Sequence, residues 1–392
     1  MKERKERTFA VAFIAAAAAL LLFGFPQVAS AQHEIFAASQ KSPTSVPGVG
    51  IIQDRPAGFN PLTASADQLS KYGLPPRPDK ATDPQGYTQW ASAMSAIKYR
   101  ASDVKAMPYS SKNMMLAKNQ PAAGSSQAIS AAPTYYLSYN WSGVANTNKL
   151  TYWNPNTSFT SIQSIFNVPA AQPPFDACGN GITGGSIPGF YEVTWNGIDG
   201  FSNGDVIQGG SLSYADCGGP ADNFYIGWVE WYPSYPILEI VCSTSPLEAC
   251  PVNAGDDFYV ITYGADSGTQ DVFVEDITQE WYGTFAIAYI TGPLLVGSSE
   301  EQIVERPGAG GGLTALANYI VQFMGGTYGY DGRGTQFYAG LQNPATAIIS
   351  MLDDDATELI SWVPLQGTAG SAGKYSLTLQ STGCAYVGGC TP

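Results

Sequence analysis

Histidine is almost absent from this chain, because His33 is the only one among 392 residues. Catalysis by a serine or cysteine paired with histidine, and a metal held by histidines, are therefore excluded for everything that follows residue 33. Zinc held by cysteines lacks support because there is no CxxC spacing, and a catalytic aspartate pair lacks support because there is no DTG or DSG motif. If the chain catalyses a reaction, side-chain carboxylates and amides must carry it.

Positive charge is scarce in the larger part of the chain. Residues 131–392 contain four Lys or Arg against 24 Asp or Glu, a net charge of −20, whereas residues 32–130 contain ten against six, a net charge of +4. A surface that acidic repels nucleic acid and gains nothing from anionic lipid. Its self-repulsion weakens as carboxylates take up protons, so the composition is consistent either with simple solubility or with an acidic working medium.

Long apolar runs are confined to the start of the chain. The opening MKERKER carries four cations, an apolar run follows from Phe9 to about Phe25, and Ala29-Ser30-Ala31 offers a small-x-small cleavage site. These are the three parts of a secretory signal peptide, here residues 1–31. An uncleaved anchor is the alternative, because the run is near the short limit of a membrane span. We expect a secreted, extracellular protein.

The six cysteines all lie after residue 131, and an even number in an exported chain indicates disulfides. Six cysteines allow fifteen arrangements. The short loops favour local pairing of Cys242 with Cys250 and of Cys384 with Cys390, which leaves Cys178 with Cys217.

Residues 32–130 are rich in Pro, Ala, Ser and Lys and indicate a removable pro-region with little regular structure. One helix is expected at Tyr87–Arg100, where Trp90, Met94 and Ile97 recur at helical spacing. The stretch from Gln120 to Pro133 is typical of a linker. The alternative is a non-catalytic surface-binding module. Under the first interpretation, acid loosens the attraction between the two oppositely charged parts, and the enzyme cuts itself between Gln120 and Tyr139.

The part after residue 131 has a different character, with short runs rich in Tyr, Val, Ile, Phe, Trp and Thr between turn residues. The runs are SIQSIFNVP, GDVIQGGSLSY, NFYIGWVEWYP, DDFYVITYGA, QDVFVEDI, GTFAIAYI and KYSLTLQS. Many short strands at such spacing predict an antiparallel β-sandwich or barrel. Residues 131–392 are long enough for one large sandwich with a substantial core.

Three segments combine aromatic and polar side chains: Trp195–Gly200 followed by Asp205–Gly210, then Gly227–Pro233, and Glu300–Glu305. Strand alternation places Trp195 with Asp199 on one face, and likewise Trp228 with Glu230. Aromatic rings beside carboxylates on a strand face suit the floor of a polymer-binding cleft. A single such residue is more often an ordinary surface residue, so no one of them identifies a site.

Together these motifs resemble the glutamic peptidase (eqolisin) family over roughly residues 135–330. The resemblance begins at Tyr139–Gly143, passes through Phe166–Pro169, the Trp-x-Gly-Ile-Asp-Gly and Trp-x-Glu-Trp-Tyr-Pro segments and Ala254–Asp256, and ends at Glu301–Glu305. Departures are Gly209 in place of the family's Thr, and Gln302 in place of its aromatic residue. The segment from 173 to 191 and the tail beyond about 335 have no clear counterpart.

The resemblance implies a two-sheet antiparallel β-sandwich, a concanavalin-like jelly roll, with Gln208 and Glu305 as the catalytic pair. It further implies that Trp195, Asp199, Trp228 and Glu230 bind substrate. Glu305 would take a proton from a water that attacks the peptide carbonyl, and Gln208 would stabilise the oxyanion. We therefore expect a pepstatin-insensitive acid endopeptidase made as a zymogen, with Glu301 outside the catalytic pair.

Two other functions remain open on the sequence. A carbohydrate-binding module or glycosidase would also use aromatic platforms, and Glu230 with Glu305 could supply the two carboxylates that glycoside hydrolysis needs. A purely structural surface protein is the other. For a peptidase we expect protein or peptide substrates, no cofactor or metal, no nucleic acid, no membrane association after signal cleavage, and a monomer.

Overall fold

The structure is a computed structural model, and every statement below is confined to the residues it describes. These are 41–52, 55–97, 104–109, 114, 116–122, 134–147, 158–174, 177–179, 189–244, 247–264, 269–290, 295–309, 312–323, 328–331, 336–337, 346–353, 359–362 and 377–381. The predicted signal peptide and His33 lie outside them.

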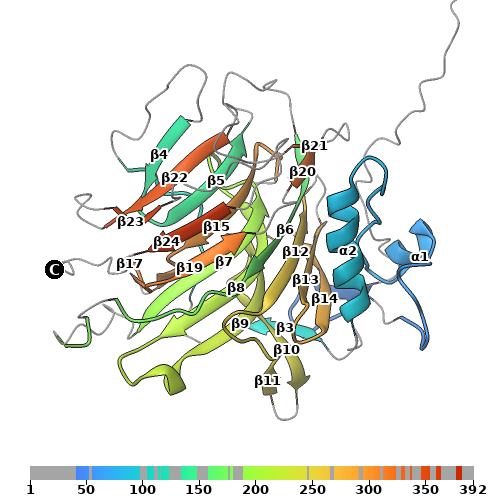
Figure 1. Ribbon diagram of the computed structural model, residues 1–392, viewed down its shortest axis with the longest axis horizontal. Coiled ribbons are helices and arrows are strands. Elements are labelled where there is room, and N and C mark those ends of the chain that lie inside the picture. Colours follow the sequence, from blue (N-terminus) through green and yellow to red (C-terminus); the bar gives the residue numbers. More distant parts are fainter. Residues whose placement is uncertain are drawn as a thin grey trace, which may run out of the picture.

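Two large, mostly antiparallel sheets form the body of the molecule, as predicted (Figure 1). The first sheet carries the candidate site and runs in the order β4, β22, β5, β15, β7, β8, β9, β10, β3. Its strands are β4 (Thr134–Ser138), β22 (Thr346–Leu352), β5 (Trp141–Thr147), β15 (Ser299–Glu305), β7 (Phe190–Ile198), β8 (Val206–Ala215), β9 (Phe224–Tyr232), β10 (Leu238–Thr244) and β3 (Lys105–Pro108). The only parallel pairs among the described strands are β22 with β4, and β7 with the short β18 (Ala315–Leu316).

The second sheet runs in the order β20, β6, β12, β13, β14, β2, β1. Its strands are β20 (Tyr328–Asp331), β6 (Phe159–Asn167), β12 (Asp257–Tyr263), β13 (Thr269–Asp276), β14 (Trp281–Ala288), β2 (Val49–Ile52) and β1 (Lys41–Pro43). The described short strands at the borders are β11 (Leu247–Ala249), β16 (Gly308–Ala309), β17 (Gly312–Leu313), β19 (Ile320–Phe323), β21 (Gln336–Phe337), β23 (Leu359–Trp362) and β24 (Leu377–Ser381). Each of the seven runs of strand-forming residues expected from the sequence overlaps one of the described strands.

The first sheet is packed with apolar side chains on both faces, unlike an antiparallel sheet that has one face in water. One face packs against the second sheet through residues such as Ile198, Val229, Phe258 and Val272. The opposite face, here called the outer face, carries a separate apolar cluster that includes Trp141, Trp195, Trp228 and Ile303. Because successive strand residues point to opposite faces, both clusters come from the same strands. A polar residue on the outer face is therefore surrounded by large apolar side chains.

The segment before residue 122 has more regular structure than its composition predicts. It contains α1 (Ala66–Lys71), α2 (Pro84–Ala96) and β1 to β3, and the helices lie against the far side of the second sheet (Figure 1). Helix α2 follows the cap Asp83 and begins at Pro84, three residues before the expected start. It ends at Ala96, before the expected Arg100, and Trp90, Met94 and the C-cap residue Ile97 are buried. The strands escape sequence prediction because they are short and owe their conformation to pairing with β14 and β10.

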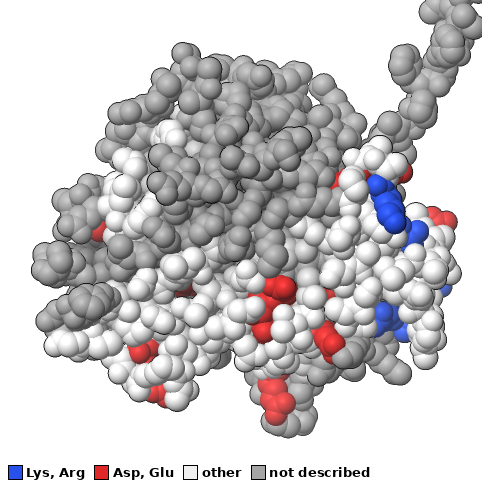
Figure 2. Space-filling model, in the orientation of Figure 1, with Lys and Arg blue, Asp and Glu red and all other residues white. Residues whose placement is uncertain are grey.

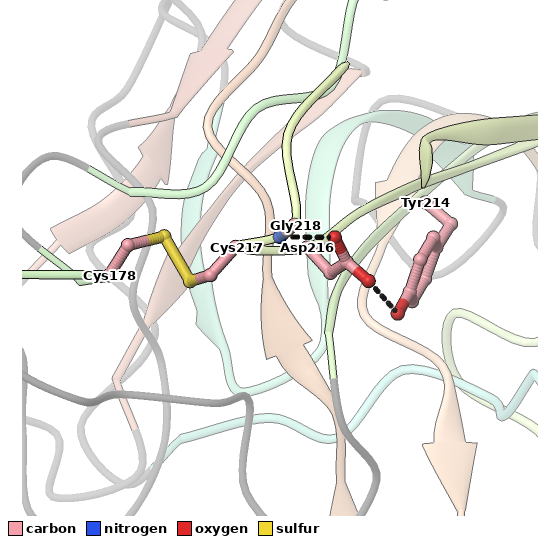
Figure 3. Close-up of a disulfide and its surroundings, with 5 residues drawn as sticks. All are labelled: Cys178, Tyr214, Asp216, Cys217 and Gly218. Atoms are coloured by element: carbon pink, nitrogen blue, oxygen red, sulfur yellow. Dashed lines mark hydrogen bonds between the residues drawn. A yellow bond between two sulfur atoms is a disulfide. The ribbon is translucent and has the colours of Figure 1, made fainter. Parts of the chain in front are cut away.

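Two of the three predicted disulfides are confirmed, Cys178–Cys217 and Cys242–Cys250. The first ties the segment 177–179 to the turn after β8, where Asp216 accepts hydrogen bonds from the Gly218 N–H and the Tyr214 hydroxyl (Figure 3). The predicted Cys384–Cys390 bridge lies outside the described residues.

The surface charge follows the split in the sequence. On the face shown in Figure 2, the described Lys and Arg side chains gather over the helical segment, whereas Asp and Glu lie mainly over the sandwich. Within the described ranges, no helix is both long and apolar enough to cross a membrane.

Candidate active site

A short stretch of the leading segment crosses the outer face of the first sheet. We call it the strap: Met114 together with Leu116–Ala122. Met114 and Leu116 are fully buried and belong to the same apolar cluster as Trp141, Trp195 and Trp228. The strap continues alongside the start of the sandwich, where Gln120 N–H donates to Asn140 Oδ1 and Pro121 pairs with Ser138.

Glu305 lies at the end of β15 with both carboxylate oxygens engaged. Oε1 accepts hydrogen bonds from the Ala117 N–H at 2.9 Å and from Asn140 Nδ2 at 3.2 Å. Oε2 accepts one from Trp195 Nε1 at 3.2 Å. The strap is held at this point from the other direction, because Trp141 Nε1 donates to the Ala117 carbonyl at 3.0 Å.

Gln208 on β8 and Glu230 on β9 are direct partners across the two strands. Gln208 Nε2 donates to Glu230 Oε2 at 2.8 Å, and Glu230 Oε1 accepts the Leu116 N–H at 3.3 Å. Leu116 and Ala117 are consecutive residues, about 3.8 Å apart between Cα atoms. Two neighbouring amides of the strap thus connect Gln208 and Glu230 with Glu305 into one polar group inside an apolar surrounding.

Burial raises the pKa of both carboxyl groups well above the ordinary value for glutamate. For Glu305 this effect is opposed by donors, namely the Ala117 N–H and the Asn140, Trp141 and Trp195 side chains, which favour the ionised form. For Glu230 the charge of Glu305 raises the pKa further. The two carboxyls therefore titrate as a coupled pair, in which Glu305 has three hydrogen-bond donors that favour its ionised form and Glu230 has two.

The two tryptophans predicted to bind substrate occupy different positions. Trp195 is fully buried on β7 and orients Glu305 through its indole N–H. Trp228 is fully buried on β9, in the apolar cluster that also holds Leu116. Gly143 permits the close approach of β5 to β15, because a Cβ at that position would lie 2.1 Å from the Gln302 carbonyl oxygen.

Asp199 lies beyond the end of β7 with φ of +69°, in the left-handed region that side chains rarely adopt. Its Oδ2 accepts the Val296 and Gly297 N–H groups, and its Oδ1 accepts the Ser298 N–H and hydroxyl. All four contacts are 2.6 to 2.8 Å long. The Asp199 carboxylate thus binds the segment that leads into β15, at the opposite end of that strand from Glu305.

Sequence reasoning missed two parts of this site. The sequence indicates Asn140 and Trp141 only as the start of the family-like region. In the structure the Asn140 amide donates to Glu305, and the Trp141 indole N–H donates to the strap. The residues of the strap were assigned to the pro-region, but their place on the first sheet was not predicted. The signal for it was weak: two large apolar residues, Met114 and Leu116, in a stretch otherwise typical of a linker. In the described part of the chain, no group of His, Cys, Asp and Glu is suited to hold a metal ion.

Comparison with known proteins identifies the family of this chain. The sequence model of the Peptidase A4 family matches residues 139–361. This match extends well past residue 330, so the expected end of the resemblance was wrong. The added part contains β22, which pairs with β5 in the first sheet. Among curated proteins, none matches this chain.

Solved structures of glutamic peptidases are similar over about half to two thirds of this chain. A scytalido-glutamic peptidase with a peptide-based transition-state analogue is 15% identical, with 62% of this chain and 98% of that chain covered and a TM-score of 0.44. SCP-B, a member of the eqolisin family in complex with the tripeptide Ala-Ile-His, is 15% identical, with 64% and 98% covered and a TM-score of 0.41. The aspergilloglutamic peptidase from Aspergillus niger is 20% identical, with 49% and 99% covered and a TM-score of 0.38.

Proposed function

Because this chain belongs to the Peptidase A4 family and is a peptide hydrolase, we propose that it is a secreted acid endopeptidase, made as an inactive precursor, with Gln208 and Glu305 as its catalytic pair. One observation carries the assignment. A peptide amide, the Ala117 N–H, already meets Glu305 in the structure, while the neighbouring amide meets the carboxyl group that orients Gln208.

The chemistry follows from the protonation of these groups. Glu305, the carboxyl with more donors to its ionised form, accepts a proton from a water that attacks the substrate carbonyl. Gln208 uses one amide hydrogen on Glu230, which leaves its second hydrogen for the oxyanion of the tetrahedral intermediate. Glu305 then donates its proton to the leaving nitrogen. We propose that Glu230 acts in its neutral form, because a second negative charge beside the oxyanion would raise the energy of the intermediate, and this favours activity at acidic pH.

The precursor state is supported by the position of the strap. Both oxygens of Glu305 and the Glu230 carboxyl are occupied by strap or neighbouring groups, and Leu116 fills the apolar surface beside Trp228. A substrate cannot reach these groups while the strap is in place. We therefore assign residues 32–130 to a pro-region. Secretion is supported by the signal-like residues 1–31 and by two disulfides, which persist in an oxidising compartment.

The test is digestion of casein by acid-treated enzyme between about pH 2 and 7, with and without pepstatin. Glu305→Gln and Gln208→Ala should each reduce kcat/KM by at least ~1000-fold, because they remove the base and the oxyanion donor. Glu301→Gln is the matched control, since Glu301 lies on the same strand and the same face and is equally buried. It should retain most of the activity. Pepstatin should have no effect, because its statine hydroxyl suits paired aspartates. Strong pepstatin inhibition, or a loss in Glu301→Gln equal to that in Glu305→Gln, would reject this site.

A further inference from the structure

The strap is a peptide held against the catalytic groups in one defined register. Ala117 is the residue whose amide nitrogen lies 2.9 Å from Glu305 Oε1, and that nitrogen belongs to the Leu116–Ala117 peptide bond. In peptide hydrolysis the group that protonates the leaving nitrogen must be within hydrogen-bonding distance of it. The strap therefore presents the nitrogen of one particular bond to Glu305.

Contacts on both sides fix this bond in place. On the amino side, the Leu116 N–H donates to Glu230 at 3.3 Å. On the carboxyl side, the Ala117 carbonyl accepts from Trp141 Nε1 at 3.0 Å and from Asn140 Nδ2 at 3.4 Å. Further along, Asn140 Nδ2 donates to the Lys118 carbonyl at 3.1 Å, and the Asn119 N–H donates to the Gly200 carbonyl at 3.0 Å. A peptide held by its backbone on both sides of one bond has the pre-alignment that hydrolysis requires.

We propose that Leu116–Ala117 is the first bond that the enzyme cuts in its own chain, and that the surface beneath Leu116 selects a large aliphatic residue on the acyl side of substrate bonds. This inference rests on the proposed function. The cut would lie upstream of the stretch from Gln120 to Tyr139, where the sequence alone places it.

The reaction balances without any further reactant. The oxygen of a water bonds to the Leu116 carbonyl carbon, and one water proton passes through Glu305 to the Ala117 nitrogen as the C–N bond breaks. The products are a carboxyl group on Leu116 and a free amine on Ala117. Loss of the bond removes the covalent link between Leu116 and Ala117, so the two ends of the strap can leave the outer face separately.

The burial of the strap residues gives the specificity. Leu116 is fully buried in the apolar cluster, Ala117 is half-buried and Lys118 is exposed. A charge in place of Leu116 would have to enter the surface formed with Trp228 and Trp195, whereas a charge in place of Lys118 would remain in water. Selection is therefore expected at the acyl-side residue, with wide tolerance at the position of Lys118.

The experiment uses the full precursor, brought to about pH 3.5, with products identified by N-terminal sequencing and intact mass. The first new N-terminus should be Ala117, and it should be missing in a Glu305→Gln precursor. Leu116→Asp should abolish this product, whereas Lys118→Asp, the matched control with the same residue introduced at an exposed position, should still give it. Each precursor is also assayed on casein.

A synthetic peptide of residues 114–122 makes the test independent of precursor folding. The mature enzyme should cut it between Leu116 and Ala117, and kcat/KM should fall about 100-fold for the Leu116→Asp peptide but less than about threefold for the Lys118→Asp peptide. If casein is digested but the first N-terminus is not Ala117, or the peptide is cut elsewhere, the inference is wrong. If no form of the enzyme digests casein at acidic pH, the proposed function itself fails.

Discussion

The buried Glu192 on β7 predicts that the molecule loses stability as the pH rises. Glu192 alternates with Thr194 and Asn196 on the face of the first sheet that meets the second, where Asn196 bonds to Ser164. Its carboxyl group accepts a hydrogen bond from the Thr194 hydroxyl. Desolvation by burial raises its pKa to about 8, in spite of hydrogen bonds from Thr194 and Ser213. Glu192 is therefore neutral in the folded protein at acidic pH.

The sign and size of the effect follow from linkage. A carboxyl whose pKa is raised by folding stabilises the fold fully below its unfolded pKa, about 4.3, and this stabilisation is lost as the pH rises through the folded value. Between those two values the loss for Glu192 amounts to about 5 kcal/mol, at 1.36 kcal/mol per pH unit. This is comparable to the total stability of many domains. Glu192→Gln, which has nearly the same shape and no proton to lose, should escape it.

The assay is urea unfolding monitored by tryptophan fluorescence, on a Glu305→Gln background so that no self-cleavage occurs. At about pH 4 the Glu192→Gln variant should match its parent within about 1 kcal/mol, and by pH 8 it should be more stable by several kcal/mol. Glu248→Gln, at an exposed position, is the matched control for the loss of one carboxyl. The reasoning fails if Glu192→Gln loses stability with rising pH as steeply as its parent does.

The remaining predictions concern the neutral carboxyl at the site, the disulfides and the order of processing. Glu230→Gln keeps that position neutral at every pH, so the alkaline limb of kcat/KM should move to higher pH, with activity at acidic pH kept within about tenfold; an unmoved limb contradicts the role given to Glu230. Replacing Cys178 and Cys217 by Ala should cost about 4 kcal/mol in urea unfolding, against about 2.5 kcal/mol for Cys242 and Cys250, because the first pair closes the longer loop; the reverse order contradicts this. Conversion of the precursor at acidic pH should be first order, with a half-time independent of precursor concentration; a half-time that lengthens on dilution means cutting between molecules.

The sheets were predictable because their strands carry the pattern locally. Runs such as Phe258–Tyr263 and Phe224–Tyr232 combine β-branched and aromatic residues between turn residues. These residue types favour a strand whichever neighbouring strand they pair with. The proposed catalytic pair was accessible for a different reason. Gln208 and Glu305 stand in unusual motifs whose order could be matched to a family, whereas nothing in the separate segments indicates that they belong to one polar group.

What could not be predicted depends on contacts between distant parts of the chain. Ala117 meets Glu305 across 188 positions, and a backbone N–H leaves no trace in the sequence. Asp199 was grouped with Trp195 from strand alternation, but the strand ends at Ile198 and Asp199 adopts a positive φ. Its carboxylate consequently turns to the segment that precedes β15. Alternation holds only within a strand, so it gives no contacts for a residue that follows the strand end.

Acidification should lead to cutting of the strap in place and not to its release. Burial raises the pKa of Glu230 and Glu305, whereas the Leu116 and Ala117 N–H groups of the strap lower it. Protonation of these carboxyls therefore weakens the two hydrogen bonds from the strap, because a neutral carboxyl is a weaker acceptor than a carboxylate. The opposite charges of the two parts of the chain work in the same direction, since protonation of the sandwich weakens their attraction. The described contacts of the leading segment with the sandwich include strand pairing, backbone hydrogen bonds and the packing of Trp90 and Leu116, and these do not titrate. Because the apolar and backbone contacts persist at acidic pH, we expect the strap to be still on the outer face at the pH where the proposed enzyme becomes active, and conversion is then a reaction within one molecule.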